Sequence, residues 1–449
     1  MINPSSLPVA FEEAMRSQLS TSFEVFQQGL RTVSPTSLRI NPAKKHVIHP
    51  DKVIWSQFGY YLNERPSFTL DPTFHGGSYY VQEASSMFLE QAFLQTIDQT
   101  KSLNILDLCA APGGKSTHLL SLMNTESLLV SNEVIRARAN ILSENIQKWG
   151  YSNVVVTSND PHDFERLKNF FDVIVVDAPC SGEGLFRKDA NAMTEWSPDN
   201  VALCSKRQRR ILGDVWPALK LGGILIYSTC TYNEKENEEN LAWLKEEQGI
   251  EFISLQLDPT WNVEQTAQDN VMGYRFFPHK VKGEGFFLSV MRKTDGGESR
   301  MVYKNSFTAT SKKIIDQLSQ WVRTPEEKTL ISRNDQVQFF PKNKNFEIEF
   351  LAKNLYLISA GTSMASVKHE KLIPEHALAL SIELNKNHFT VLDVELPQAL
   401  QYLRKETLEV HGEKKGFALI QYDGISLGWA NVLDNRMNNL YPSEWRIRK

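Results

Sequence analysis

The sequence predicts an α/β protein whose largest part is a doubly wound parallel sheet. Between residues 71 and 295, apolar runs typical of buried strands alternate with helical stretches, which indicates a parallel sheet covered by helices. The chain has 449 residues, 41% of them apolar and 23% charged, so it is long enough for several domains with substantial cores. Acidic residues and cysteines directly follow the apolar runs, which places reactive side chains at one edge of the predicted sheet.

Five segments have the short apolar pattern of buried strands. They are LNILDLC (103–109), LLVSNE (128–133), NVVVTSND (153–160), FDVIVVDA (171–178) and GGILIYSTC (222–230). Helices are expected between them, including 136–150 and 197–221. In the second helix we expect Ser197 to be the N-cap and Pro198 to lie in the first turn.

Smaller units are expected on both sides of this region. An amphipathic helix at about 8–30 and a short LRIN segment at 38–41 characterise the N-terminal part. The polar, glycine-containing KTDGGESRM (293–301) is typical of a linker. Short strand candidates, FALIQY and ISLGWANVL, follow near the C-terminus. We therefore expect four units, at residues 1–70, 71–295, 302–365 and 366–449.

Composition argues against several classes of protein. No stretch approaches 18 uninterrupted apolar residues, so no membrane-spanning helix is expected. The opening MINPSSLPVAFEEAM lacks the basic region and apolar core of a signal peptide, which makes a cytoplasmic location the expectation. The four cysteines lie far apart without a CxxC pair, so we expect free thiols and no metal site. A net charge of −4 does not by itself indicate a nucleic-acid partner.

In an open parallel sheet, ligands bind at the carboxyl ends of the strands. The residues that end the five strands are Asp107 to Cys109, Glu133, Asp160, Asp177 with Cys180, and Cys230. A single cysteine is commonly a buried core residue. Three cysteines and several acids at the same edge instead predict a chemical site.

The glycine loop CAAPGGK (109–115) follows the first strand. It is not a P-loop, because that motif requires glycine where Cys109 stands, and it is not GxGxxG. So short a loop before a helix suits a ligand with one carboxylate. Glu133 is placed to accept hydrogen bonds from ribose hydroxyls, and Asp160 to face an adenine amino group. Together these features predict an S-adenosylmethionine site.

Longer motifs resemble those of a known family. LDLCAAPGGKSTHLL, FDVIVVDAPCSGEG and YSTCT followed by EKENEEN resemble the successive motifs of the Nol/Nop/Sun-type RNA (cytosine carbon-5) methyltransferases. YYVQEASSM (79–87) is similar to the segment that precedes their catalytic domain, and the resemblance covers about residues 35–293. The C-terminal third resembles, more weakly, the PUA-like tail of the bacterial RsmF/YebU ribosomal-RNA branch.

The resemblance implies a Rossmann-like class I S-adenosylmethionine methyltransferase domain, an N-terminal RNA-binding segment and a PUA-like RNA-binding domain at 366–449. It implies that the loop Cys109, Ala110, Ala111, Pro112, Gly113, Gly114 and Lys115 holds the methionine end of the cofactor. Glu133 is implied at the ribose, Asp160 at the adenine, and Asp177 near both cofactor and target base. Arg138 is either a further contact or a solvated helix residue.

Methylation of cytosine carbon 5 requires a thiol, because carbon 5 becomes nucleophilic only after a thiolate has added to carbon 6. From the residues alone, either Cys180 or Cys230 can be that thiol. The resemblance implies Cys230 as the nucleophile and Cys180 as the residue that helps to release product. Lys115 is expected either to lower a thiol pKa or to bind loop carbonyls only.

The expected partner is RNA, in particular ribosomal RNA or the small ribosomal subunit, with the protein acting as a monomer. Three segments are candidates for binding the RNA: the N-terminal segment, the basic run SKRQRR (205–210) and the tail. SKRQRR is equally typical of a solvated helix face. The alternatives are a transfer-RNA methyltransferase, a methyltransferase for DNA or a small molecule, and a non-catalytic RNA-binding assembly factor.

Overall fold

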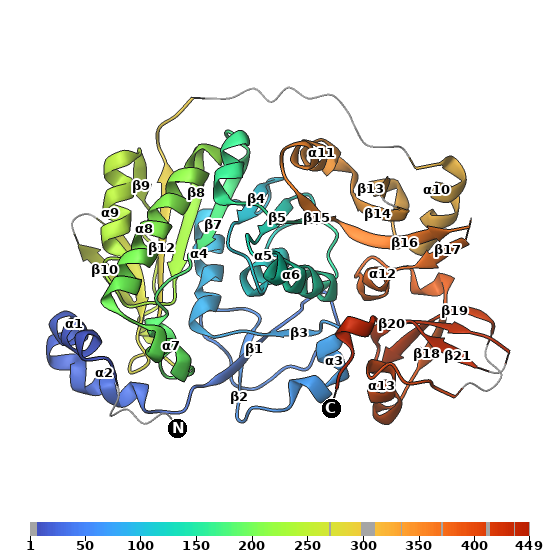
Figure 1. Ribbon diagram of the computed structural model, residues 1–449, viewed down its shortest axis with the longest axis horizontal. Coiled ribbons are helices and arrows are strands. Elements are labelled where there is room, and N and C mark those ends of the chain that lie inside the picture. Colours follow the sequence, from blue (N-terminus) through green and yellow to red (C-terminus); the bar gives the residue numbers. More distant parts are fainter. Residues whose placement is uncertain are drawn as a thin grey trace.

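The computed structural model describes residues 7–268, 271–297, 310–333, 335–369, 371–409, 414–434 and 436–448. The second half of the predicted linker 293–301, the start of the predicted unit 302–365 and the first six residues lie outside the described residues. Figure 1 shows the N-terminal elements along the lower side of the central sheet and the C-terminal sheets to its right.

A ten-stranded sheet forms the centre of the molecule. Its parallel strands are β4 (Asn104–Asp107), β5 (Leu128–Asn132), β6 (Val154–Thr157), β7 (Phe171–Asp177) and β8 (Leu219–Thr229). Their spatial order, β8-β7-β4-β5-β6, reverses direction beside β4, as in a doubly wound fold. All five predicted strands therefore form, and the predicted fold class is confirmed.

Antiparallel strands extend this sheet at both edges. On the β8 side they are β12 (Phe286–Lys293), β11 (Val271–Phe276) and β10 (Glu264–Gln268), with β9 (Ile250–Phe252) also paired to β12. On the other side β15 (Leu357–Ala360) pairs with β6, so a strand from beyond the predicted linker completes the central sheet.

The parallel strands are apolar on both faces because helices cover both faces. In β7 the residues from Val173 to Val176 are at most 1% exposed. One face packs against α4 (Leu89–Thr96), α5 (Gly114–Leu122) and α6 (Arg136–Trp149). The other packs against α8 (Pro198–Val215), α9 (Glu238–Glu247) and α11 (Asn345–Asn354).

Two predicted helices differ in extent from the structure. Ser197 caps α8 as predicted by accepting from the Asn200 N–H at 3.1 Å, but the helix ends at Val215 rather than 221. Pro217 follows and cannot continue the helical hydrogen-bond ladder, and Leu219 already starts β8. The predicted helix at 8–30 is two helices, α1 (Val9–Leu19) and α2 (Phe23–Leu30), separated by a turn at Ser20, where φ is 49°.

The remaining elements form three smaller sheets with short helices. The N-terminal sheet has the order β2 (Gly59–Leu62), β1 (Thr36–Ile40), β3 (Tyr79–Val81), and α3 (Pro72–His75) lies next to it in sequence. Two four-stranded sheets follow the linker: β13 (Lys328–Arg333), β14 (Gln336–Pro341), β16 (Thr362–Lys368), β17 (Lys371–Pro374); and β18 (Thr390–Asp393), β19 (Gly416–Tyr422), β20 (Ile425–Val432), β21 (Met437–Asn439). The other helices are α7 (Ala190–Glu195), α10 (Lys312–Leu318), α12 (His376–Leu380) and α13 (Leu396–Leu403). Among the described residues, none of the helices is long and apolar enough to span a membrane.

Candidate active site

Two thiols meet at the carboxyl ends of β7 and β8. The two strands are parallel neighbours in which Asp177 pairs with Ser228, so the turns that follow them emerge side by side. The Sγ atoms of Cys180 and Cys230 lie 3.0 Å apart, and both residues are half-buried. The structure therefore places both sulfurs where one substrate atom can reach them.

Two glycines allow this approach. A Cβ added to Gly184 would lie 2.3 Å from the Gly285 carbonyl oxygen and 2.8 Å from that of Cys230. The Gly184 N–H instead donates to the Cys230 carbonyl at 2.9 Å, which joins the two loops directly. Gly182 has a φ of 76°, which is unfavourable for other residues.

Two buried carboxylates tie the thiol loops together in opposite directions. Glu236, from the Cys230 loop, accepts from the backbone N–H of Ser181 at 2.9 Å and from its hydroxyl at 2.5 Å. Glu183, from the Cys180 loop, accepts from the N–H of Tyr232 and the amide of Asn233, both at 3.1 Å. Each loop thus supplies the carboxylate that the other binds, and this reciprocal clasp fixes the separation of the sulfurs.

Burial shifts the pKa values in this cluster. The hydrogen bond from Cys230, followed by burial, raises the pKa of Cys180 well above its ordinary value. Burial raises the pKa of Glu183 and Glu236, although their hydrogen bonds oppose the shift. Cys180 therefore keeps its proton at neutral pH and can share it with the sulfur of Cys230.

Asp177 lies beside the thiols and is held on both oxygens. One carboxylate oxygen is 2.8 Å from the Lys115 ammonium, and the other accepts from the Ser228 hydroxyl at 2.8 Å. The Asp177 side chain is 36% exposed, so its remaining lone pairs face outward. The ion pair of Lys115 is with this carboxylate, so Lys115 is not bound to loop carbonyls only.

The loop Cys109 to Lys115 leads from β4 into α5. Gly113 has a φ of 117° and precedes the first turn of the helix. Arg138 and Asn145 donate to the carbonyls of Ala111 and Pro112, at 3.0 and 2.8 Å, and so brace the loop from α6. Burial raises the pKa of Cys109, which marks it as an unreactive thiol.

Asp107 ends β4 beneath this loop and is fully buried. Its Oδ2 accepts from the Ser116 hydroxyl at 2.7 Å, whereas its Oδ1 has no partner among the described residues. Burial raises the pKa of Asp107 to about 7. An unpartnered buried acceptor under a glycine loop is a position that a ligand group can satisfy.

Glu133 and Asp160 lie at the ends of the next two strands. Glu133 is 4% exposed; it accepts from the Ile135 N–H at 2.9 Å and pairs with Arg138 at 3.2 Å. Asp160 accepts from both terminal nitrogens of Arg210 at 3.2 Å. Each carboxylate keeps further acceptor sites.

These residues fit S-adenosylmethionine by type. The loop offers backbone N–H groups for a carboxylate, Asp107 an acceptor for an ammonium group, and Glu133 and Asp160 acceptors for ribose and adenine. Within the described ranges, no group of three His, Cys, Asp or Glu side chains could hold a metal ion.

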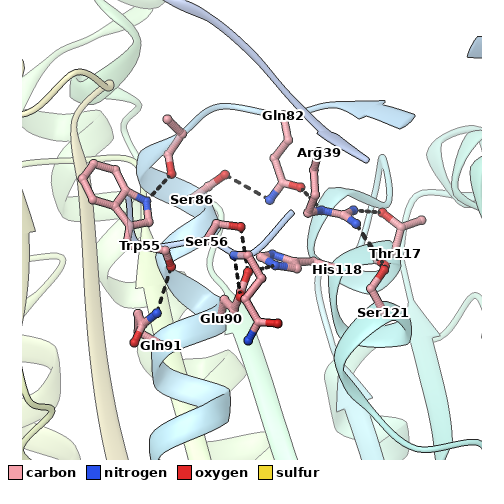
Figure 2. A network of polar contacts seen from close by, with 12 residues as sticks. Arg39, Trp55, Ser56, Gln82, Ser86, Glu90, Gln91, Thr117, His118 and Ser121 are labelled. Atoms are coloured by element: carbon pink, nitrogen blue, oxygen red, sulfur yellow. Dashed lines mark hydrogen bonds and ion pairs between the residues drawn. The ribbon is translucent and has the colours of Figure 1, made fainter. Parts of the chain in front are cut away.

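A buried polar network supports the cofactor loop from the N-terminal sheet (Figure 2). Arg39, on β1, donates to the Gly114 carbonyl at 3.2 Å and to the Thr117 hydroxyl at 2.6 Å, and stacks over the Trp149 ring at 4.6 Å. One turn along α5, His118 contacts the Glu90 carboxylate at 3.0 Å. Arg39, Glu90 and His118 are all fully buried, so the N-terminal sheet is built into the cofactor site.

The basic run SKRQRR contributes to the site more than its charge suggests. Gln208 donates to the Pro179 carbonyl at 3.0 Å and to Glu236 at 2.9 Å, which braces the thiol loops. Arg209 donates to Asn240 at 2.8 Å, and Arg210 pairs with Asp160. Lys206 and Arg207 are exposed. Part of this run is therefore structural.

Comparison with known proteins shows the family to which the chain is similar. A family model for the 16S rRNA methyltransferase RsmB/F matches residues 94–292. Models for the N-terminal domain of 16S rRNA methyltransferase RsmF and for the methyltransferase RsmF PUA domain match residues 7–84 and 389–447. The ribosomal RNA small subunit methyltransferase F of Shewanella woodyi is 32% identical over 416 residues, which cover 88% of this chain and 84% of the relative. The chain belongs to this family. The same-named protein of Shewanella loihica is 30% identical over 88% of this chain and 83% of its own length.

Solved structures support the fold. A methyltransferase homologue from Pyrococcus horikoshii is 26% identical, with a TM-score of 0.52, over 61% of this chain and 90% of its own. NSun6 from the same organism has a TM-score of 0.52 at 18% identity over 64% of this chain and 99% of its own. The predicted family and methyl donor are thus confirmed: the protein is a methyltransferase that uses S-adenosylmethionine.

Sequence reasoning assigned no role to several residues of this site. Glu183 and Glu236 stand inside the quoted motifs, and Asp107 ends a predicted strand, but nothing in the sequence shows that these acids are buried. The joining of LRIN (38–41) and YYVQEASSM (79–87) through Arg39 and Gln82 was also missed. An arginine inside an apolar strand was the available signal.

Proposed function

We propose that the protein methylates carbon 5 of a specific cytosine in RNA, with small-subunit (16S) ribosomal RNA as its substrate. The observation that carries the proposal is the 3.0 Å contact between Cys180 and Cys230 beside Asp177. A methyltransferase acting on a nucleophilic oxygen or nitrogen has no need of two adjoining thiols, whereas carbon 5 of cytosine needs a thiol to become nucleophilic. The names of the relatives supply the ribosomal substrate.

Cys230 is the nucleophile in this proposal. Its thiolate forms a bond to carbon 6 of the cytosine, and the electron pair of the carbon 5–carbon 6 double bond moves toward carbon 5 and the ring nitrogen. Asp177 accepts from the exocyclic amino group of the base, and Lys115 places a positive charge near the negative charge that develops on the ring. S-adenosylmethionine, held by Gly113, Glu133 and Asp160, supplies the electrophilic methyl group.

Cys180 completes the reaction after the methyl group has reached carbon 5. As the carbon 6–sulfur bond breaks, Cys180 gives its proton to the departing Cys230 sulfur and then takes the proton lost from carbon 5. Its raised pKa suits this task, because Cys180 holds a proton while Cys230 attacks. One proton then leaves the pair for solvent, which restores the starting state.

The target base must leave its stack to reach sulfurs that are half-buried, at a cost of a few kcal/mol. Single-stranded or loop regions of RNA reduce that cost. We propose that the protein acts in the cytoplasm as a monomer, with the N-terminal segment 1–70 and the tail 366–449 binding RNA around the catalytic unit 71–295 and the unit 302–365.

The proposal is tested with purified full-length protein, labelled S-adenosylmethionine and three substrates: transcribed 16S rRNA, transfer RNA and duplex DNA. We expect transfer to the ribosomal RNA alone, and 5-methylcytidine as the labelled nucleoside after digestion. Label in another nucleoside would refute the chemistry, and preferential labelling of transfer RNA or DNA would refute the substrate.

A further inference from the structure

A cavity of about 340 Å³ lies where three parts of the chain meet, apart from the thiols. The N-terminal part of the chain contributes residues 43–45 and Gly76, and Gly424 lines the cavity together with Ile425 and Ser426, the first two residues of β20. The third wall is formed by residues 379–382 and 384–387 with Arg323. This position makes the cavity a junction between the N-terminal and C-terminal sheets.

The lining of this junction cavity is basic. Lys44, Lys45, Arg323 and Lys386 all line it, and none of its lining residues, which all belong to the described chain, is acidic. Lys45 pairs with Asp423 just outside. The other three cations form no ion pair within 4.0 Å with any described carboxylate. Their charges are therefore not neutralised by direct contact.

The uncompensated cations donate to neutral oxygens. Lys44 donates to the carbonyls of Gly76 at 2.8 Å and Lys148 at 2.6 Å. Lys386 donates to the Gln421 side chain at 2.8 Å and the Gly424 carbonyl at 3.2 Å. An ammonium group carries three N–H donors, so each lysine has one donor beyond these two contacts. Arg323 donates to the Ile382 carbonyl and keeps most of its five.

The cations also repel one another. Burial, with the charge of Lys386 in second place, lowers the pKa of Lys44 to about 7. Burial lowers the pKa of Lys386 as well; Asp393 opposes this shift and Arg323 adds to it. Gathering like charges in a partly desolvated site is unfavourable unless an anion completes it.

We propose that the junction cavity binds a phosphate group of the RNA backbone, outside the target nucleotide. This inference rests on the proposed RNA substrate. A backbone phosphate fits better than a base because no aromatic ring lines the cavity for stacking, whereas lysine and arginine donors are those that phosphate prefers. Asn385 and Ser426 add neutral donors.

The position of the cavity suits a contact that orients the RNA relative to the thiols. Phosphate contacts fix the position of a nucleic acid without reading its sequence. Residues 43–45 follow β1, the strand whose Arg39 braces the cofactor loop, and Ile425 and Ser426 begin β20. A phosphate held between them ties the RNA to both the N-terminal and the C-terminal sheets at a fixed offset from the thiols.

The test uses the full chain, a transcribed 16S rRNA probe and the variants Arg323→Gln, Lys386→Gln and their combination. Lys44 is left intact because it holds the C-terminal end of α6. We expect the double variant to bind RNA ~10-fold more weakly and to lower the slope of log affinity against log salt by about 1. KM for RNA should rise while kcat stays unchanged. The exposed Lys371→Gln, from β17, is the matched control.

Thermal unfolding of each variant separates loss of the contact from loss of the fold. A double variant that melts like the wild type and also keeps its salt slope and KM would overturn the inference. Competition by polyglutamate, without any effect of the substitutions on RNA binding, would overturn it in favour of an acidic protein partner. Wild-type protein that fails to methylate the RNA would refute the proposed function instead. The binding measurement would still decide whether the cavity binds an RNA phosphate.

Discussion

Two polar clusters lie on either side of the cofactor loop, and they are built in opposite ways. In the anchoring network of Figure 2, Arg39, Glu90 and His118 are fully buried, and Arg39 and Glu90 each have several partners, whereas His118 contacts Glu90 alone among the described residues. The proposed catalytic edge, made of Cys180, Cys230, Asp177 and Lys115, is partly exposed and leaves donors and acceptors unused. The side chains of the anchoring network are therefore closed off from solvent, whereas those of the edge remain accessible to a ligand and are held in place by the buried carboxylates behind them.

The largest expected effect comes from the catalytic edge. Cys230→Ala should reduce methyl transfer by at least about three orders of magnitude, because it removes the nucleophile itself. Stability should change little, since the thiol is half-buried. Activity and thermal unfolding measured on the same preparation check this, with Cys204→Ala, the buried cysteine of α8, as control. Residual activity near that of the control would contradict the role of Cys230.

Substitutions in the anchoring network should reduce stability more than they reduce the chemical step. Arg39→Met should lower the free energy of unfolding by about 3–5 kcal/mol, because it leaves Gln82, Thr117 and the Gly114 carbonyl without their buried donor. Affinity for S-adenosylmethionine should fall with it, since α5 begins at the loop that holds the cofactor. Chemical unfolding and cofactor titration measure the two effects. A fully stable variant with normal cofactor affinity would show that the network is dispensable.

The network should also give the protein a pH-dependent stability. Burial, aided by the charge of Arg39, lowers the pKa of His118 from 6.5 to about 4, so the folded protein holds this imidazole neutral, with Nε2–H donated to Glu90. As pH falls from 6.5 to 4, His118 becomes protonated in the unfolded chain but stays neutral in the folded chain. The free energy of unfolding therefore declines by about 3 kcal/mol at most.

His118→Gln keeps a donor for Glu90 but cannot titrate. The difference in unfolding free energy between wild type and this variant should therefore shrink as pH falls from 6.5 to 4. The contributions of the other titrating groups are the same in both proteins and cancel in this difference. A difference that stays constant from pH 7 to pH 4 would mean that His118 is not held neutral.

The smallest expected effect tests the reciprocal clasp between the thiol loops. Glu236→Gln replaces an acceptor-only carboxylate by an amide that cannot accept from all of Ser181 and Gln208. We expect kcat to fall about tenfold, equivalent to about 1.4 kcal/mol, with KM for S-adenosylmethionine unchanged. Glu239→Gln, an exposed acid three residues along, is the matched control. A change in KM alone would assign Glu236 to cofactor binding instead.

The residues of the proposed catalytic edge could be predicted from the sequence better than those of the buried anchoring network. Apolar runs locate buried strands, and a cysteine or acid directly after such a run lies at the carboxyl edge by topology alone, so Cys180, Cys230 and Glu133 could be placed. Burial of a polar residue depends on distant segments. Glu236 lies in the charged run EKENEEN, which is typical of a solvated surface. In the structure it is fully buried and accepts a hydrogen bond from Ser181, 55 residues earlier.

The same limit explains other differences. Asp160 was expected at the end of a strand and lies three residues beyond the end of β6, and its partner Arg210 is 50 residues away on α8. β15 is a four-residue strand whose apolar pattern is too short to assign, and it joins the central sheet only because β6 offers a free edge. The break between α1 and α2 follows from Ser20, whose conformation no local pattern indicated.

The division of labour between the two thiols is tested most directly by trapping covalent RNA. Wild type, Cys180→Ala and Cys230→Ala are incubated with 16S rRNA and S-adenosylmethionine, then separated under denaturing conditions that preserve a carbon–sulfur bond. We expect Cys180→Ala to accumulate a protein–RNA adduct, wild type to show little, and Cys230→Ala to show none. An adduct that forms with Cys230→Ala and disappears with Cys180→Ala would contradict the assignment.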